Sequence, residues 1–255
     1  MNKIFKYVLL DILRNRIILG FTFLMLAISL TVLNLEDSSA KGLLSLLNIV
    51  LLVLPLVSII FSTIYFYNSA EFIELLVCQP VRRGRILLSL YGGLAFSLLI
   101  SFWIGVGLPL LVYDHTMASY LLIGSGSLLT VIFTALAVFG SVLTRDKARG
   151  IGVAIFLWFY FSILYDGLVL FLLFQFSDYP LEKPVVVLGA LNPIDLSRIV
   201  MLLQLDNSAM MGYTGAVYQS VFGHGGGTLL SLGILLLWAA FPVWAGVRRF
   251  RRKDL

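Results

Sequence analysis

One carboxylate lies inside a long apolar run, in the order Tyr165-Asp166-Gly167. An ionised group in lipid costs at least a few kcal/mol, so Asp166 is expected to face protein or a wet cavity. A carboxylate in that place can bind a substrate, relay protons or hold two helices together through a hydrogen bond. The structural role, in which Asp166 holds two helices together, is the interpretation that we favour.

A second polar segment, 68–85, connects two apolar runs. Its Asn68-x-x-Glu71 start is typical of a capped helix. Pro80 ends that helix, because the residue before a proline is pushed out of the α region. Three arginines, at positions 82, 83 and 85, then anchor the next apolar run at an anionic membrane surface.

The helix expected in this segment is amphipathic. Its spacing places Phe72, Leu75 and Leu76 on one face and Glu71 and Glu74 on another. One interpretation is an ordinary helix at the membrane surface, and the other is a helix that receives a cytoplasmic partner. The pattern alone leaves both open.

A third group of polar residues lies in the segment 175–225. Asn192 suits the N-cap of a short helix, Pro193 suits its first position, and Asp195 can reach the free backbone donors. Asp195 and Arg198 are three residues apart, so they can pair on one face. An apolar stripe follows, made of Leu196, Ile199, Val200 and Leu203. We expect a capped helix that covers the ends of the other helices; a binding role for its polar face is the alternative.

The same region carries side chains that can bind copper, namely Met201, Met210, Met211 and His224. They form no close His-x-His or Met-x-x-Met arrangement, and the other histidine, His115, is on a different loop. The sequence therefore predicts no metal site.

Catalytic motifs are also missing from the sequence. There is no Gly-x-Ser tripeptide, no His-Glu-x-x-His motif and no nucleotide-binding Gly-Lys-Ser/Thr motif. A single membrane aspartate cannot form an aspartyl dyad. We therefore expect a protein without a catalytic site, and any work it does must draw energy from another subunit.

The composition shows what kind of elements must position these residues. Of the 255 residues, 60% are hydrophobic and 12% are charged, whereas soluble domains have about 25% charged residues. This excludes a soluble enzyme, a disordered chain and a nucleic-acid-binding module, and the single cysteine, Cys78, excludes an internal disulfide.

Six apolar runs are long enough to cross a bilayer as helices. The expected fold class is an all-α polytopic membrane protein, with 1–255 forming a single transmembrane domain. The predicted spans are about 17–35, 43–67, 86–113, 119–143, 151–174 and 226–247.

The first 16 residues are too charged for a cleaved signal peptide, because basic and acidic residues are spread through them. Apolar residues recur at helical spacing, which predicts an amphipathic helix on the membrane surface. The stripe consists of Ile4, Phe5, Val8, Leu9, Ile12 and Leu13.

The basic residues predict the orientation. If both termini are cytoplasmic, the inner segments carry 15 of the 18 Lys and Arg residues, and only Lys41, Lys183 and Arg198 lie on the outer side. We therefore expect a multi-pass protein surrounded by membrane lipid, with both termini in the cytoplasm and segment 175–225 on the outer side.

The stretch Glu71-Phe-Ile-Glu-Leu-Leu-Val-Cys-Gln-Pro-Val-Arg-Arg83, with the amphipathic N-terminus and the six spans, resembles the ABC-2 class of ABC transporter permeases. In that class a similar stretch forms the helix that contacts the ATPase subunit. The resemblance implies an ATPase contact at Glu71, Phe72, Glu74, Leu75, Gln79, Pro80, Arg82 and Arg83.

Three shorter stretches are similar to the NosY-like branch of this class, which serves maturation of nitrous oxide reductase and other multicopper enzymes. They are Trp158-Phe-…-Tyr165-Asp166, Leu191-Asn-Pro-Ile-Asp-Leu-Ser-Arg198 and Thr214-Gly-Ala-Val. The resemblance implies an outer lobe that includes Asn192, Pro193, Asp195 and Arg198.

The resemblance also implies a bacterial inner membrane, with segment 175–225 in the periplasm, and it implies the partners. Two copies of the chain would pair and bind two ATPase subunits, which hold ATP and Mg, while this chain binds no cofactor. The outer face would dock a periplasmic β-helical, NosD-like protein, and a copper chaperone lipoprotein is a further expected partner. Two alternatives stay open: an exporter of a lipid, glycan or peptide, and a membrane scaffold that transports nothing.

Overall fold

The computed structural model describes residues 2–35, 39–144, 146–176, 182–204 and 212–251. Side-chain surroundings are described for 4–35, 40–144, 146–176, 186–202 and 226–251. Every regular element in these ranges is a helix. The elements, two of them π-helices, are α1 (Asn2–Leu13), α2 (Arg16–Leu35), α3 (Ser39–Asn68), α4 (Ala70–Val77), α5 (Arg83–Phe102), η1 (Trp103–Gly107), α6 (Leu108–Tyr113), α7 (Met117–Leu143), α8 (Lys147–Phe159), η2 (Tyr160–Leu164), α9 (Tyr165–Gln175), α10 (Glu182–Ala190), α11 (Pro193–Gln204) and α12 (Gly212–Arg251).

Within the described ranges, six helices are long and apolar enough to cross a membrane, which confirms the predicted all-α, six-span fold class. Each predicted run falls within one of them. The candidate spans are Arg16–Leu35, Ala40–Asn68, Arg83–Tyr113, Met117–Leu143, Lys147–Gln175 and Gly226–Arg251.

The spans differ greatly in how far they are buried. In α7, 78% of the most apolar window is buried, whereas the first, fifth and sixth spans have 22%, 17% and 22%. The helix α7 is therefore the centre of the bundle, and the three loosely packed spans present apolar side chains outward. In a membrane such surfaces are in contact with lipid or with another membrane protein.

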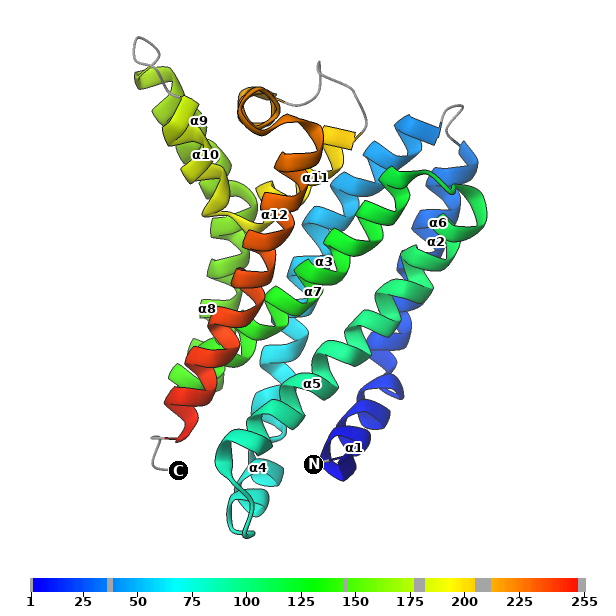
Figure 1. The fold of residues 1–255 in the computed structure, drawn as a ribbon. Coiled ribbons are helices and arrows are strands. Elements are labelled where there is room, and N and C mark those ends of the chain that lie inside the picture. The colour runs from blue at the N-terminus through cyan, green and yellow to red at the C-terminus, as the bar shows by residue number, and fades with distance from the viewer. Residues whose placement is uncertain (1, 36–38, 145, 177–181, 205–211, 252–255) are drawn as a thin grey trace.

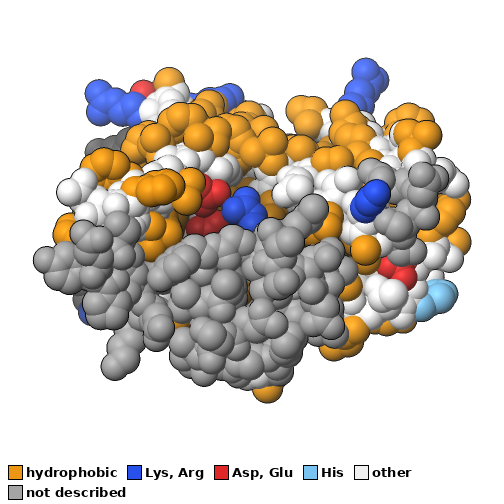
Figure 2. Space-filling view, turned by 90° about the horizontal axis from the view of Figure 1, so that it is seen from above, with side chains coloured by type: hydrophobic (Ala, Val, Ile, Leu, Met, Phe, Trp, Pro, Cys, Tyr) orange, Lys and Arg blue, Asp and Glu red, His pale blue; other side chains and the backbone are white. Residues whose placement is uncertain are grey.

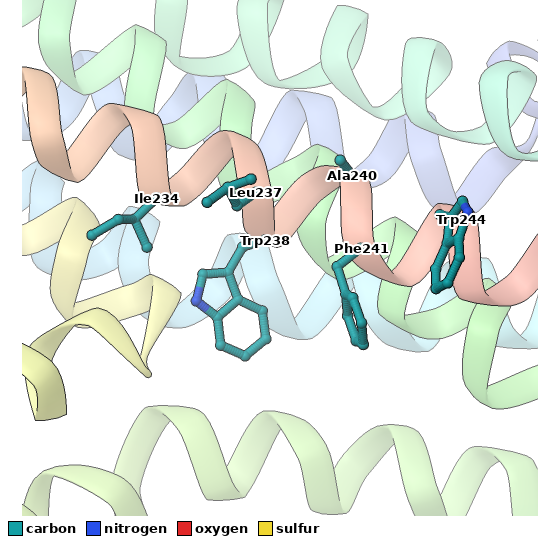
Figure 3. Close-up of a pocket in the computed structure, with 6 residues that line it drawn as sticks. All are labelled: Ile234, Leu237, Trp238, Ala240, Phe241 and Trp244. Atoms are coloured by element: carbon teal, nitrogen blue, oxygen red, sulfur yellow. The ribbon is translucent and has the colours of Figure 1, made fainter.

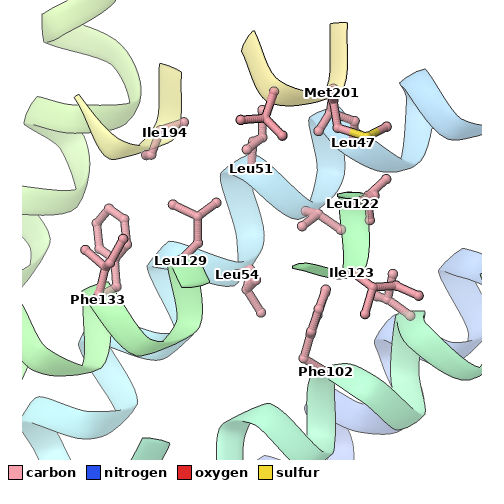
Figure 4. Packing of buried hydrophobic residues seen from close by; sticks show 14 of the residues in the cluster. Leu47, Leu51, Leu54, Phe102, Leu122, Ile123, Leu129, Phe133, Ile194 and Met201 are labelled. Atoms are coloured by element: carbon pink, nitrogen blue, oxygen red, sulfur yellow. The ribbon is translucent and has the colours of Figure 1, made fainter. Parts of the chain in front are cut away.

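The core that surrounds α7 reaches from α2 to α12. Leucines of α3 interdigitate with residues of α7 such as Leu122 and Phe133, and Ile194 and Met201 of α11 cover them from one end (Figure 4). Three residues of the expected apolar stripe, Leu196, Ile199 and Val200, are buried and form the surface by which α11 packs on the bundle, whereas the side chain of Leu203 lies outside the described residues.

The two ends of the bundle differ in character (Figure 1). Both termini, α1, α4 and the last turn of α12, which carries Arg248, Arg249 and Arg251, lie at one end, called here the basic end. The helices α10 and α11 lie at the opposite end, called here the far end. The predicted amphipathic segment forms α1, whose Val8 and Ile12 are buried in a cluster shared with α5.

Two features of the predicted spans differ from the structure, namely where the last helix begins and whether the fifth span is continuous. The last helix, α12, begins at Gly212 and runs for 40 residues, so the glycine-rich run 223–227 is helical and continues into the predicted span without a break. The fifth span is interrupted by η2. A π-turn leaves a carbonyl group without its usual helical partner, and the sequence signals of helix periodicity do not reveal such a turn.

Candidate functional site

The first candidate site is α4, at the basic end. Ile73 and Leu76 are buried and pack in a cluster with Val8 of α1 and Ile86 of α5, while Glu71 and Glu74 are exposed. Because its inner face is fixed to two other helices, α4 presents its acidic side outward in a defined orientation.

The predicted division of faces is wrong for one residue. Leu75 was expected beside Phe72 and Leu76, but its side chain is 68% exposed, on the side that carries Glu71 and Glu74. These three positions follow the i, i+3, i+4 spacing of one helix face. Phe72 turns the other way, because its ring packs against Tyr7 of α1 with a centroid distance of 5.3 Å.

The predicted cap of α4 is also wrong. Asn68 is the last residue of α3, and α4 begins after Ser69, which makes no capping hydrogen bond through its side chain. The Asn68 amide oxygen instead accepts a hydrogen bond of 2.8 Å from the ammonium group of Lys147, at the start of α8. A residue still inside one helix cannot have the extended backbone that an N-cap requires.

The chain between α4 and α5 follows the predicted pattern more closely. The helix α4 ends at Val77, and Gln79 and Pro80 are exposed in the turn that follows. Arg82 is exposed and precedes α5, whose first residue is Arg83. Cys78 is exposed here as well.

The second candidate site is at the far end, where α11 begins. The amide oxygen of Asn192 accepts a hydrogen bond of 3.0 Å from the Ile194 N–H, and Pro193 is the first residue of the helix, as predicted. The amide nitrogen of the fully buried Asn192 donates to the Phe161 carbonyl in η2, at 2.9 Å. One side chain thus caps α11 and satisfies a carbonyl of the π-helix.

Arg198 joins two carboxylates in this region. Its guanidinium lies 3.4 Å from Asp195 on its own helix, as the sequence predicted, and 3.1 Å from Asp166 on α9. Seen from this end, acidic and basic groups lie next to each other near the centre of the described surface, with hydrophobic side chains around them (Figure 2). The partner of Asp166 is therefore Arg198, which lies 32 residues later in the chain, on α11. This agrees with the interpretation that Asp166 holds two helices together.

The arrangement of two carboxylates around one arginine affects ionisation. Burial raises the pKa of Asp195 from 3.8 to about 7, and the neighbouring Asp166 acts in the same direction, against the lowering effect of Arg198. Below this pKa the protonated Asp195 carboxyl can donate a hydrogen bond to Asp166, and above it the Asp195 carboxylate adds one negative charge beside Arg198.

Two further contacts were not anticipated from the sequence. The Tyr165 hydroxyl donates to the Leu188 carbonyl of α10 at 2.6 Å, and the indole N–H of Trp238 donates to the Ala190 carbonyl at 3.0 Å. The sequence signal for the first contact is weak: Tyr165, an aromatic residue with a polar group, directly precedes Asp166.

The structure describes only part of the region with copper-compatible side chains. Met201 is buried in the core under α11. Met210 and Met211 lie outside the described residues, as does the side chain of His224. Within the described part of the chain, no three His, Cys, Asp or Glu side chains lie close enough to hold a metal ion.

An open apolar groove of about 630 Å³ runs along α12 (Figure 3). The described residues that line it include no charged side chain, and the Trp238 indole donates to α10. A groove of this kind suits hydrocarbon rather than a polar solute. Its lining residues are Ile234, Leu237, Trp238, Ala240, Phe241 and Trp244.

Comparison with known proteins connects these features to a family. Residues 3–255 match the family model described as ABC-2 family transporter protein. A protein of Pseudomonas aeruginosa named "Probable ABC transporter permease protein NosY" is 27% identical, over 93% of this chain and 90% of that protein. A protein of the same name from Stutzerimonas stutzeri is 26% identical over the same shares. With a family match over almost its full length and six candidate spans, the chain belongs to the ABC-2 family of transporter permeases.

Proposed function

We propose that this chain is the membrane subunit of an ABC transporter in which a separate ATPase docks on α4 and drives a rearrangement at the far end. The observation that carries the proposal is the anchored amphipathic helix. Ile73 and Leu76 fix α4 to the bundle, while Glu71, Glu74 and Leu75 are left outward for a partner. A helix fixed on its inner face transmits a push from the partner to the spans.

The orientation that we propose places the basic end in the cytoplasm. Arginines cluster there at the start of α5 and in the last turn of α12. Lys and Arg are enriched on the cytoplasmic side of membrane proteins, where the leaflet is anionic. The ATPase, which holds ATP and Mg, then meets α4, and the helices α10 and α11 face the periplasm.

For the cellular role, we propose maturation of the copper site of nitrous oxide reductase. The shared name of the two relatives supports this role, at 27% and 26% identity. The assembly contains two copies of this chain, two ATPase subunits and a periplasmic β-helical, NosD-like protein, with a copper chaperone lipoprotein as a further partner. The copper content of nitrous oxide reductase, measured in cells that lack this chain, tests the role: unchanged copper content contradicts it.

Charge reversal tests the ATPase contact. We expect Glu74→Arg to abolish co-purification of the ATPase subunit with the full-length chain, because the partner surface must complement an exposed carboxylate. Arg149→Glu is the matched control, since Arg149 is 85% exposed near the start of α8 and forms only a long ion pair with Asp146. If the ATPase co-purifies equally well with both variants and its activity is unchanged, α4 is not its docking site.

A second candidate function is export of a lipid, and the apolar groove along α12 favours it. This function needs the same ATPase contact. The two candidate functions are distinguished by reconstituting the complex in vesicles that contain a fluorescent phospholipid. ATP-dependent movement of this phospholipid between the leaflets supports export. A scaffold that transports nothing would retain its partners without binding an ATPase.

A further inference from the structure

The fifth span, Lys147–Gln175, is the least buried of the six candidate spans in the described chain, with 17% of its most apolar window buried. Because apolar packing within the chain is so limited, specific polar contacts have a large share in fixing the position of this span relative to the other described helices. The structure shows such contacts at both of its ends, and they attach the two halves of the span to different parts of the molecule.

The half toward the basic end, α8, is attached to α3. The Lys147 ammonium donates to the Asn68 amide oxygen, and the Tyr67 hydroxyl contacts the hydroxyl of Thr144, the C-cap of α7 three residues before α8 begins. These two contacts are called here the basic-end clasp. Farther along, the Trp158 indole donates to the Leu52 carbonyl at 3.1 Å. Because α3 ends at Asn68, two residues before α4 starts, the basic-end clasp adjoins the helix proposed to receive the ATPase.

The half toward the far end, α9, is attached to α10 and α11. Asp166 accepts from Arg198 at 3.1 Å, and the Tyr165 hydroxyl donates to the Leu188 carbonyl at 2.6 Å. These two contacts are called here the far-end clasp. Ion pairs and hydrogen bonds of partly buried groups are directional, so they transmit displacement better than the lipid-facing surface of the span.

Between the two halves lies η2, Tyr160–Leu164. Sharp bends in helices occur at π-turns, because the local hydrogen-bond ladder is already broken there. The Phe161 carbonyl in η2 accepts from Asn192, the residue that caps α11. A change of angle at η2 therefore acts directly on the first turn of α11.

From these contacts we infer that the fifth span is the element that carries motion from α4 to the far end, with Lys147 and Arg198 as its positioning residues and η2 as its hinge. The inference rests on the proposed function, since it presumes that an ATPase moves α4. It assigns a role to Asp166: the carboxylate is the anchor by which α9 pulls or pushes α11.

The test is a distance measurement in the complete complex with the co-purified ATPase subunit. Spin labels are attached at Met117→Cys and Leu191→Cys, two exposed positions at the far end, after Cys78→Ser removes the native thiol. The distance between the labels is recorded with and without ATP and vanadate. In the complex with both clasps unaltered, we expect this distance to change when ATP and vanadate are added.

The variants Arg198→Gln and Lys147→Gln each remove one of the two contacts of a clasp. For each we expect the nucleotide-dependent change, compared at equal ATP turnover, to fall by at least half. Arg149→Gln removes a neighbouring exposed cation and is the matched control, for which we expect the full change. The exchange Asp166→Arg with Arg198→Asp reverses the far-end ion pair, and we expect it to restore part of the change.

Two outcomes separate the inference from the proposed function. If the ATPase subunit does not co-purify with the unaltered chain, the proposed function is wrong. If the complex assembles and responds to nucleotide, but both glutamine variants respond as strongly as the control, then the fifth span does not carry the motion and the inference is overturned. If the complex with Arg198→Gln has a lowered melting temperature, the variant Asp166→Asn is used in its place, because it is a smaller change in the same ion pair.

Discussion

Replacing Asp195 by asparagine tests the electrostatics of the far end directly. In the folded chain burial and Asp166 raise the pKa of Asp195 from 3.8 to about 7. The folded state therefore holds this proton more tightly than the unfolded state, and the free energy of unfolding falls as the pH rises from about 4 to about 7. The asparagine amide in the Asp195→Asn variant does not titrate but can still donate to Asp166, so this variant should lose the pH dependence.

The magnitude follows from the difference between the two pKa values. Each pKa unit corresponds to about 1.36 kcal/mol, so between pH 5 and pH 7 the wild-type chain loses at most about 3 kcal/mol through this group. The Asp195 side chain is 16% exposed, and water entry reduces the loss. For domains of nearly this length, a loss of 1 kcal/mol in the free energy of unfolding lowers the melting temperature by about 2–4 °C. We therefore expect the wild-type melting temperature to fall by several degrees.

The assay is thermal unfolding of the isolated chain in lipid nanodiscs at several pH values from 5 to 8. We expect the melting temperature of the wild type to fall across this range more steeply than that of Asp195→Asn, which should be the more stable of the two at pH 8. Glu71→Gln, an exposed carboxylate on α4, serves as the control and should follow the wild-type curve. Parallel curves for the wild type and Asp195→Asn would refute the account of the cluster.

Three further predictions concern packing and docking. Asn192→Ala removes the cap of α11 and the donor to η2, and should lower stability by about 1–3 kcal/mol in thermal or denaturant unfolding. Gly150→Ala should be destabilising by about 1–3 kcal/mol, because a methyl group there would overlap a tyrosine ring of α3, whereas Gly152→Ala has open space and should be nearly neutral. Leu75→Ala should weaken co-purification of the ATPase without lowering the melting temperature, whereas Leu76→Ala should lower the melting temperature by removing a buried side chain.

Local signals in the sequence were sufficient for the spans and for the start of α11. A run of about 20 apolar residues without charge has one stable form in lipid, which is a helix, and the six predicted runs fall within the six helices found. Asn192 followed by Pro193 defines a helix start through interactions within a few residues. The pair Asp195–Arg198 also needed only helical spacing.

The faces of α4 were harder to predict. An eight-residue helix offers little more than two turns of pattern, and both the Leu75 side and the Phe72 side contain apolar residues. The packing of α1 decides between them, because Tyr7 packs against Phe72 and leaves Leu75 outside. The helix α1 is more than fifty residues earlier in the chain, so no local pattern contains this information.

The sequence by itself thus determined that the chain is a six-span membrane protein. It also determined that a short amphipathic helix connects the second and third spans and that a capped helix lies between the fifth and sixth spans. Each of these follows from the free energy of a single segment in water or lipid. Only the tertiary structure decided that Asp166 meets Arg198, that Asn68 binds Lys147, and that η2 interrupts the fifth span. Those contacts join segments that are distant along the chain, and they depend on how whole helices pack against one another.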